Sequence, residues 1–154
     1  MREILFRGQT RKYGERVRMG DGQKLPGRWV YGGVLQGIGS HSIIYGGENV
    51  NDPSEGLQKW CVHTDTLGQY TGLNDKNGKK IFEGDIVKSE FTQKPYIVCF
   101  GEYTYTNEYG EEESACGWYN EEEYGYVTAF GRPDAWATVI GNIHDNPELI
   151  EESV

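Results

Sequence analysis

The sequence predicts an all-β protein, and three observations support this fold class. First, the 154 residues include 22 glycines, 11 tyrosines, 5 phenylalanines and 4 tryptophans, and large rings on a glycine-punctuated chain favour sheets. Second, short segments such as residues 86–91 alternate apolar and polar side chains with the period of a strand. Third, Asn77-Gly78 lies between two such segments, and Asn-Gly is typical of tight hairpin turns.

The expected strands follow one another along the chain and are separated by glycine-containing turns. They are residues 3–8, 28–35, 42–45, 60–63, 67–73, 86–91, 96–100 and 135–140, with a longer ribbon within 101–126. Ile81 and Phe82 are expected to supply apolar anchors after the Asn77-Gly78 turn. Residues 9–27 and 48–59 are expected to be loops. Asn146, Pro147 and Glu148 match the start of a helix, which predicts a short C-terminal helix over roughly residues 147–152.

The length is sufficient for a core without disulfides, since a chain of this size buries roughly two-thirds of its unfolded surface. The three cysteines, Cys61, Cys99 and Cys116, are scattered, and no apolar stretch follows Met1. We therefore expect a reduced, cytoplasmic protein. No run approaches the ~20 apolar residues of a membrane span, so no membrane association is expected.

Charge is distributed unevenly along the chain, whose formal net charge is −9. Residues 1–65 carry nine basic and seven acidic side chains, whereas residues 66–154 carry six basic and 17 acidic ones. The basic side chains are concentrated at the start, at Arg2, Arg7, Arg11, Lys12, Arg16, Arg18, Lys24 and Arg28. A basic entry segment therefore precedes an acidic body.

The basic segment has two interpretations. Its cations could bind nucleic-acid phosphates while Tyr13 or Trp29 stacks on bases. The acidic total disfavours this, because the body would repel nucleic acid at long range. The alternative is contact with the acidic body or with a neighbouring subunit.

The segment from Gly101 to Tyr126 is rich in tyrosine and holds eight glutamates and no lysine or arginine. Two glutamate clusters stand out, Glu111–Glu113 and Glu121–Glu123. A charge run of this kind usually only keeps a hairpin soluble. As a functional surface it would bind a basic protein partner, or imitate the negative surface of DNA to occupy a host nuclease or DNA-binding protein.

Groupings that would support catalysis or metal binding are weak. Cys61, His63, Cys99 and Cys116 could supply a Cys3His zinc site, but the paired Cys-x2-4-Cys spacing is missing, which favours buried, inert thiols.

The neighbours Ser40-His41 and His144-Asp145, and the acids Glu83 and Asp85, are more readily explained as turn residues than as a triad or a glycosidase pair. The glycines at 32–33 and 37–39 lack a phosphate-loop pattern. We therefore expect no enzyme activity and no cofactor.

Several blocks of the sequence together resemble the YopX-like family of bacteriophages and prophages. They are Phe6-Arg7-Gly8, Trp29 to Gly32, Gly68 to Leu73, Asp75 to Gly78, Glu83 to Val87, Ile140 to Ile143 and Asn146 to Leu149. The resemblance implies a partly open SH3-like barrel over residues 66–154, preceded by a small β-hairpin element over residues 1–65, unless the two form one continuous domain. It implies no catalytic residues. Residues 9–26, 46–60 and 101–131 carry no family pattern.

The polar and amphipathic members of these blocks are the candidate binding residues: Trp29, Tyr70, Asp75, Asp85 and Asn142. Each also has a structural explanation, as a core ring, a turn former or a hydrogen-bonding residue at the end of a strand. The function expected from the whole sequence is that of a non-enzymatic phage or prophage accessory protein. It would bind another macromolecule, preferably a protein, with self-assembly, DNA mimicry and nucleic-acid binding as alternatives.

Overall fold

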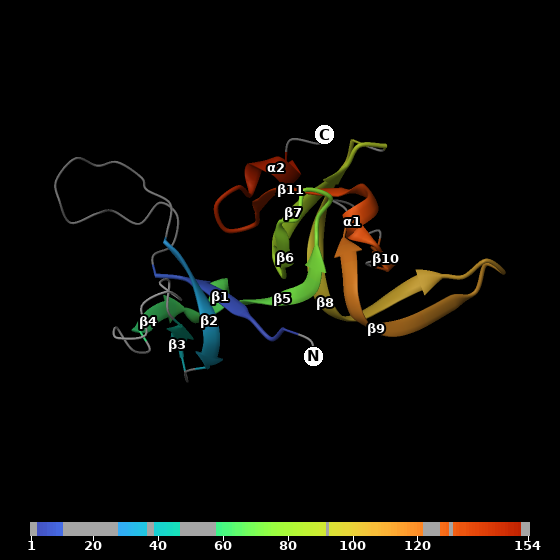
Figure 1. Cartoon of the computed structure of the whole chain (residues 1–154). Coiled ribbons are helices and arrows are strands. Elements are labelled where there is room, and N and C mark those ends of the chain that lie inside the picture. Colours follow the sequence, from blue (N-terminus) through green and yellow to red (C-terminus); the bar gives the residue numbers. More distant parts are fainter. Residues whose placement is uncertain are drawn as a thin grey trace. The chain divides into compact units, whose positions relative to one another are not determined.

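The computed structural model describes residues 3–10, 28–36, 39–46, 58–91, 93–121, 127–129 and 131–151. The chain divides into two compact units, Met1–Tyr70 (unit 1) and Thr71–Val154 (unit 2). The division falls within a strand, β5 (Gly68–Asn74), whereas the sequence placed it after residue 65. Figure 1 shows the elements of both units.

Unit 1 is an antiparallel sheet with the strand order β4-β3-β2-β1-β5. Its elements are β1 (Phe6–Gln9), β2 (Trp29–Leu35), β3 (His41–Gly46), β4 (Gln58–His63), the 3-10 helix η1 (Thr64–Thr66) and the first part of β5. One face of the sheet buries Val30, Ile44 and Val62, and Phe6, Val34, Trp60 and Leu67 pack against them. Every second residue of β3 points into this core, as the period of a strand requires.

The backbones of β2 and β3 approach each other closely at Tyr31-Gly32 and Tyr45-Gly46. A Cβ atom on Gly32 would collide with the carbonyl oxygen of Tyr45, and one on Gly46 would collide with the carbonyl oxygen of Tyr31. Only glycine allows two backbones to pass this closely. The contact between the two strands therefore requires the glycines at positions 32 and 46.

Unit 2 is built on a second antiparallel sheet with the strand order β10-β9-β8-β7-β11. The strands of this sheet are β7 (Asp85–Ser89), β8 (Pro95–Thr106), β9 (Glu112–Glu121), β10 (Val127–Ala129) and β11 (Ala137–Asn142). The unit also contains β6 (Lys80–Phe82), which pairs with β5, and the short helices α1 (Pro133–Trp136) and α2 (Glu148–Glu151). The core consists of Ile81, Val87, Val98 and Ala137, against which Tyr96, Trp118, Trp136 and Val139 pack.

The expected all-β class is confirmed, and the described strands form two antiparallel sheets that do not close into a barrel. The Asn77-Gly78 turn is also confirmed, since it follows β5 and Gly78 has a φ of +81°. The C-terminal helix is present as α2. The expected strand over residues 135–140 was wrong at its start, because Pro133 begins the helix α1 and the strand starts at Ala137.

Candidate functional site

The most exposed regular structure of unit 2 is the far end of the β8–β9 hairpin. At the base of the hairpin, β8 pairs with β7 at residues 95–97 and β9 pairs with β10 at residues 119–121. Among the described residues, the strands from Gly101 to Gly117 pair only with each other. We call residues 101–117 the arm, and Figure 1 shows it extending from the unit 2 sheet.

One face of the arm, the tyrosine face, carries aromatic rings. It holds Tyr103 and Tyr105 of β8 and continues at the base to Tyr119 of β9. The ring centroids of Tyr103 and Tyr119 are 5.0 Å apart, and those of Tyr103 and Tyr105 are 6.0 Å apart. The Tyr105 hydroxyl donates a hydrogen bond to a Glu113 carboxylate oxygen at 2.7 Å. All three rings are half-buried against their neighbours, so they form an ordered stripe with one side exposed to solvent.

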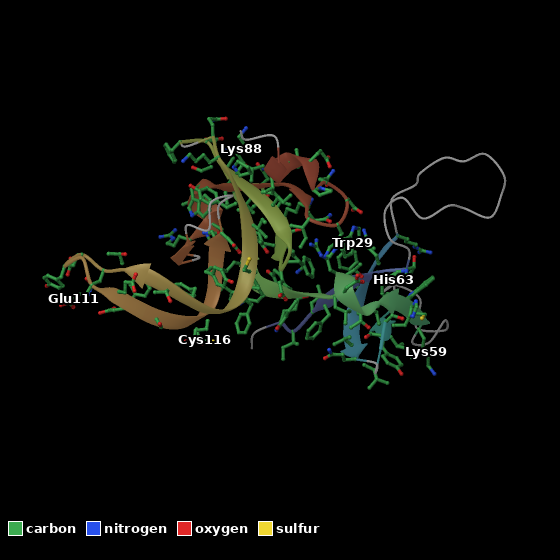
Figure 2. All side chains as sticks on the ribbon, turned by 180° about the vertical axis from the view of Figure 1, so that it is seen from behind. Trp29, Lys59, His63, Lys88, Glu111 and Cys116 are labelled. Carbon is green, nitrogen blue, oxygen red and sulfur yellow. The ribbon has the colours of Figure 1, made fainter. Side chains whose placement is uncertain are left out.

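The opposite face of the arm is polar. Six exposed side chains alternate with the tyrosine face, namely Glu102, Thr104, Thr106, Glu112, Ser114 and Cys116. At the base of this face the rings of Phe100 and Trp118 meet edge to face, with centroids 4.9 Å apart. Trp118 packs on the unit 2 core, so the arm is anchored through this ring. Figure 2 shows Glu111 at the tip of the arm and Cys116 nearer its base.

The tip of the arm is fixed by the side chain of Asn107. Its oxygen accepts hydrogen bonds from the backbone N–H groups of Tyr109 and Glu111, both at 2.9 Å. Its amide nitrogen donates to Glu113 at 3.0 Å. The turn therefore presents the ring of Tyr109, which is 79% exposed, in a defined position.

The electrostatic character of the arm is purely acidic, because the chain has no lysine or arginine between residues 95 and 131. The hydrogen bonds from Tyr105 and Asn107 lower the pKa of Glu113, so this carboxylate stays charged to lower pH than an ordinary glutamate. The same bond to Glu113 raises the pKa of Tyr105. Of the acidic cluster Glu121–Glu123, only Glu121 is among the described residues.

The three thiols are free and differ in environment. Burial and the carboxylate of Glu121 raise the pKa of Cys99 to about 12, so this thiol stays protonated and unreactive at neutral pH. Cys61 and Cys116 are exposed, which corrects the expectation that all three thiols are buried. Cys99 and Cys116 lie on opposite faces of the hairpin, so they cannot share a ligand there. Among the described residues, no group of three or more His, Cys, Asp and Glu side chains is arranged to hold a metal ion.

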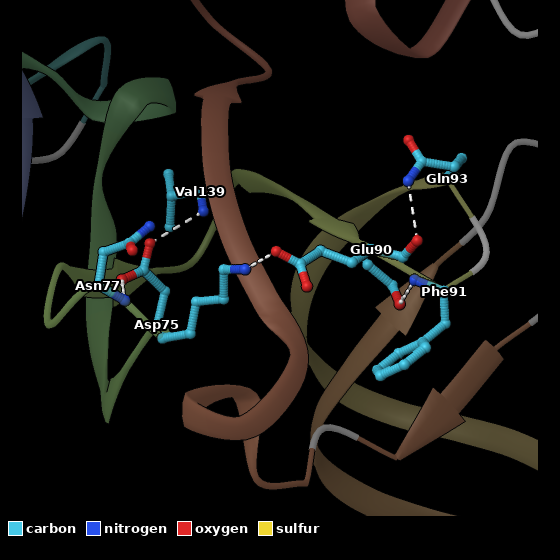
Figure 3. A network of polar contacts seen from close by, with 8 residues as sticks. Asp75, Asn77, Glu90, Phe91, Gln93 and Val139 are labelled. Carbon is cyan, nitrogen blue, oxygen red and sulfur yellow. Dashed lines mark hydrogen bonds and ion pairs between the residues drawn. The ribbon is translucent and has the colours of Figure 1, made fainter.

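Of the candidate binding residues, Asp75 is 3% exposed and organises the turn between β5 and β6. Its Oδ1 accepts the N–H groups of Asn77 and Lys79, each at 2.9 Å, and its Oδ2 accepts the N–H of Val139 at 3.1 Å. Figure 3 shows the contacts of Asp75 with Asn77 and Val139, and also Glu90, which forms an ion pair with Lys76. Asp75 therefore ties the turn to β11.

The other candidates are also positioned by contacts within their own unit. Asp85, 2% exposed, accepts the N–H of Phe82 at 2.8 Å. The side-chain oxygen of Asn142 accepts the N–H groups of His144 and Asp145, both at 3.0 Å. Tyr70 is buried at 6% exposure, and its N–H donates to the carbonyl of Leu5.

Trp29 belongs to unit 1, where the guanidinium of Arg7 lies 4.4 Å from the centre of its ring. Arg28 stacks in the same way on Trp60, at 4.5 Å. These two arginines are the members of the basic segment that the structure describes, and both are engaged with tryptophan rings. The other six cations of the segment lie outside the described residues.

His41 contacts two residues that the sequence singled out, Ser40 and His63. Ser40 Oγ lies 2.9 Å from His41 Nδ1, so these sequence neighbours do meet. The ring beside His41 is that of His63, across the β3–β4 pair, which sequence reasoning missed because it depends on strand register. His144 and Asp145 lie in the turn before α2, as expected.

A family model described as YopX protein matches residues 28–151, which is most of the chain. The chain belongs to the YopX family. The match includes the arm and, apart from Phe6-Arg7-Gly8, the blocks on which the resemblance was based. A search of curated proteins found no match. Within the described parts of this YopX family member, no helix is long and apolar enough to span a membrane.

Proposed function

We propose that this YopX family member is a non-enzymatic interaction module and that its arm binds a cationic surface of a protein partner. The observation that carries the proposal is the tyrosine face, an ordered stripe of rings bordered by carboxylates on an arm without cations. In line with the family resemblance, we place this activity in a bacteriophage or prophage setting.

Charge supports a cationic partner. Glu102, Glu108 and Glu111–Glu113 are exposed along the arm and at its tip, and no positive side chain on these strands offsets them. Such a field attracts a basic surface during encounter and repels nucleic acid. The on-rate should therefore fall as salt is added.

The rings provide the contact area. Tyrosine offers a large, amphipathic surface with few rotatable bonds, and it is enriched at the energetically dominant positions of interfaces. Tyr103, Tyr105 and Tyr109 would stack on guanidinium or apolar groups of the partner while Glu113 accepts their hydrogen bonds. Because Asn107 already fixes the tip, little conformational entropy is lost on binding.

The test compares capture of proteins from bacterial lysate by the wild-type chain and two charge-matched triple variants. The arm variant carries Glu111→Gln, Glu112→Gln and Glu113→Gln. The control variant carries Asp65→Asn, Asp134→Asn and Glu148→Gln, three exposed acids outside the arm, and so has the same net charge. A partner held by the arm should be lost with the arm variant and retained with the control.

The captured partner is then purified and its affinity measured against Tyr109→Ser, which changes the tip ring without changing charge. We expect a weakening of at least about tenfold, the typical effect of truncating an interface anchor. Equal capture by wild type and both variants would refute a role for the arm. If nuclease treatment of the lysate abolishes capture, the partner of the arm is a nucleic acid and not a protein.

DNA mimicry is a narrower form of the proposal, favoured by carboxylates on both faces and at the tip of the arm. It requires that the captured protein bind DNA and that duplex DNA displace it from the arm. If duplex DNA fails to displace the partner, the DNA-mimic hypothesis is refuted, whereas the general proposal of a protein-binding arm is not.

A further inference from the structure

Two of the three histidines of the chain meet across a strand pair of unit 1. His41 of β3 and His63 of β4 are direct partners in the antiparallel register, and their ring centroids are 4.8 Å apart with the planes inclined by 40°. Because side chains of directly opposed residues leave the sheet on the same side, both imidazoles project from the face opposite the Ile44 and Val62 core.

The pair lies at one end of the two strands, since His41 is the first residue of β3 and His63 is the last residue of β4. His41 is exposed, and His63 is half-buried at the end of β4, where Figure 2 marks it together with Lys59. Ser40 Oγ lies 2.9 Å from His41 Nδ1. When Nδ1 carries the proton, it donates to this hydroxyl, and the lone pair of His41 is then on Nε2.

We propose that His41 and His63 form a binding site for a borderline divalent transition-metal ion such as Zn²⁺, Ni²⁺ or Cu²⁺. A tetrahedral ion with Zn–N bonds of about 2.0–2.1 Å needs two nitrogens roughly 3.3 Å apart. Two imidazoles with centroids 4.8 Å apart reach this separation by rotation about their side-chain bonds, without movement of the strands.

The donor set decides the class of ion. Imidazole nitrogen suits Zn²⁺, Ni²⁺ and Cu²⁺ and is a poor ligand for Mg²⁺ and Ca²⁺, which prefer oxygen. Hydrogen bonding of His41 to Ser40 is the kind of outer-shell contact that orients a metal-binding histidine. Since only two histidines supply the site, water completes the coordination, and the ion exchanges rather than being permanently held.

This site differs from the Cys3His grouping considered from the sequence. It uses His41, which that grouping lacked, and it needs neither Cys99 nor Cys116. Cys61 lies two residues from His63 on the same face of β4, and its exposed thiol is the nearest sulfur along that strand. The experiment therefore has to separate imidazole binding from thiol binding.

The test is a titration of the untagged, reduced 154-residue chain with Zn²⁺. Binding is monitored by the NMR signals of the imidazole protons of its three histidines. We expect the signals of His41 and His63 to shift together and that of His144 to stay unchanged. His41→Asn and His63→Asn should each raise the apparent Kd at least about tenfold, the lower limit seen on losing even an outer-shell partner. His144→Asn is the matched control and should bind as the wild type does.

Two further measurements keep the result unambiguous. Cys61→Ser should retain the affinity within about twofold, and Mg²⁺ should produce no shift. If Zn²⁺ moves no histidine signal, or moves all three equally, the proposal is refuted. It is equally refuted if Cys61→Ser abolishes binding while His41→Asn leaves it intact. His41 is exposed, so its variant should fold and provides the test even if the His63 variant does not.

Discussion

Unit 2 holds carboxylates in two opposite environments. Asp75 is buried in the turn after β5 and Asp85 at the start of β7, and both carboxylates accept hydrogen bonds from the backbone, whereas Glu111–Glu113 are exposed at the end of the arm. Buried carboxylates are tolerated only because the backbone satisfies them, and removing one leaves the N–H groups without an acceptor. The exposed carboxylates contribute charge with little effect on folding. The same functional group therefore supports the fold in one region and is available to a partner in the other.

The largest effect is expected from Asp75→Ala, which removes the acceptor of three backbone N–H groups at once. We expect the free energy of unfolding to fall by about 3 kcal/mol, measured by urea denaturation. Asp75→Asn should cost less, because its oxygen can still serve Asn77 and Lys79. If the free energy of unfolding of Asp75→Ala lies within about 0.5 kcal/mol of the wild-type value, the buried carboxylate does not stabilise the fold.

A smaller effect is expected from Asn142→Ala in the turn before α2. The N–H groups of His144 and Asp145 lose their shared acceptor, and Asp145 loses the Nδ2 donor at 3.1 Å. We expect a loss of about 1–2 kcal/mol in the same urea measurement, since this turn is nearer to solvent. Glu148→Gln, which lies just beyond the turn, is the control and should stay at the wild-type value.

The triple variant Glu111→Gln, Glu112→Gln, Glu113→Gln should have a free energy of unfolding within about 0.5 kcal/mol of the wild type, because all three side chains are exposed and the amide oxygen introduced at position 113 can still accept the Tyr105 and Asn107 hydrogen bonds. Partner capture should nevertheless be lost. Thermal unfolding and capture measured on the same preparation test both statements. A large loss of stability in this variant would show that the carboxylates of the arm also stabilise the fold.

The smallest effect concerns titration within the arm. The pKa of Glu113 is lowered by the Tyr105 hydroxyl and by Asn107, so these bonds favour the folded state at neutral pH. That contribution is lost as the pH falls through the folded-state pKa. NMR titration of the carboxyl signals should give Glu113 a pKa below that of an ordinary glutamate, and the substitution Tyr105→Phe should raise the pKa of Glu113. An unchanged pKa in this variant would mean that the hydrogen bond is not formed in solution.

Local signals were enough to predict much of the fold. Alternating side chains identified the strands, and Asn77-Gly78 identified the turn that Asp75 stabilises. The hydrogen bond that Asp75 accepts from Val139 on β11 joins residues 64 positions apart in the sequence, and no local pattern could reveal it. Pro133 was a helix signal that the strand prediction for residues 135–140 overlooked.

The candidate sites were harder to predict because they depend on register. Alternation places Tyr103 and Tyr105 on one face of β8, but only the pairing with β9 brings Tyr119 to them. Likewise, the sequence suggested Ser40 for His41 and Cys61 for His63, and only the pairing of β3 with β4 brings the two rings together. Register is set by non-local pairing, which a single sequence leaves open.

The edges of the arm have a consequence for the colloidal behaviour of the protein. Among the described residues, the arm is a two-stranded ribbon whose strands pair only with each other, and the outer backbone groups of such a ribbon are a template for adding strands from other molecules. Around the arm, electrostatic repulsion between glutamates of neighbouring molecules opposes such stacking. At the sequence pI of about 4.8 the net charge of the whole chain vanishes, so the long-range repulsion between molecules is weakest there, while the ring of Tyr109 remains exposed. Concentrated solutions should therefore be kept well above this pH, where like charge holds the molecules apart.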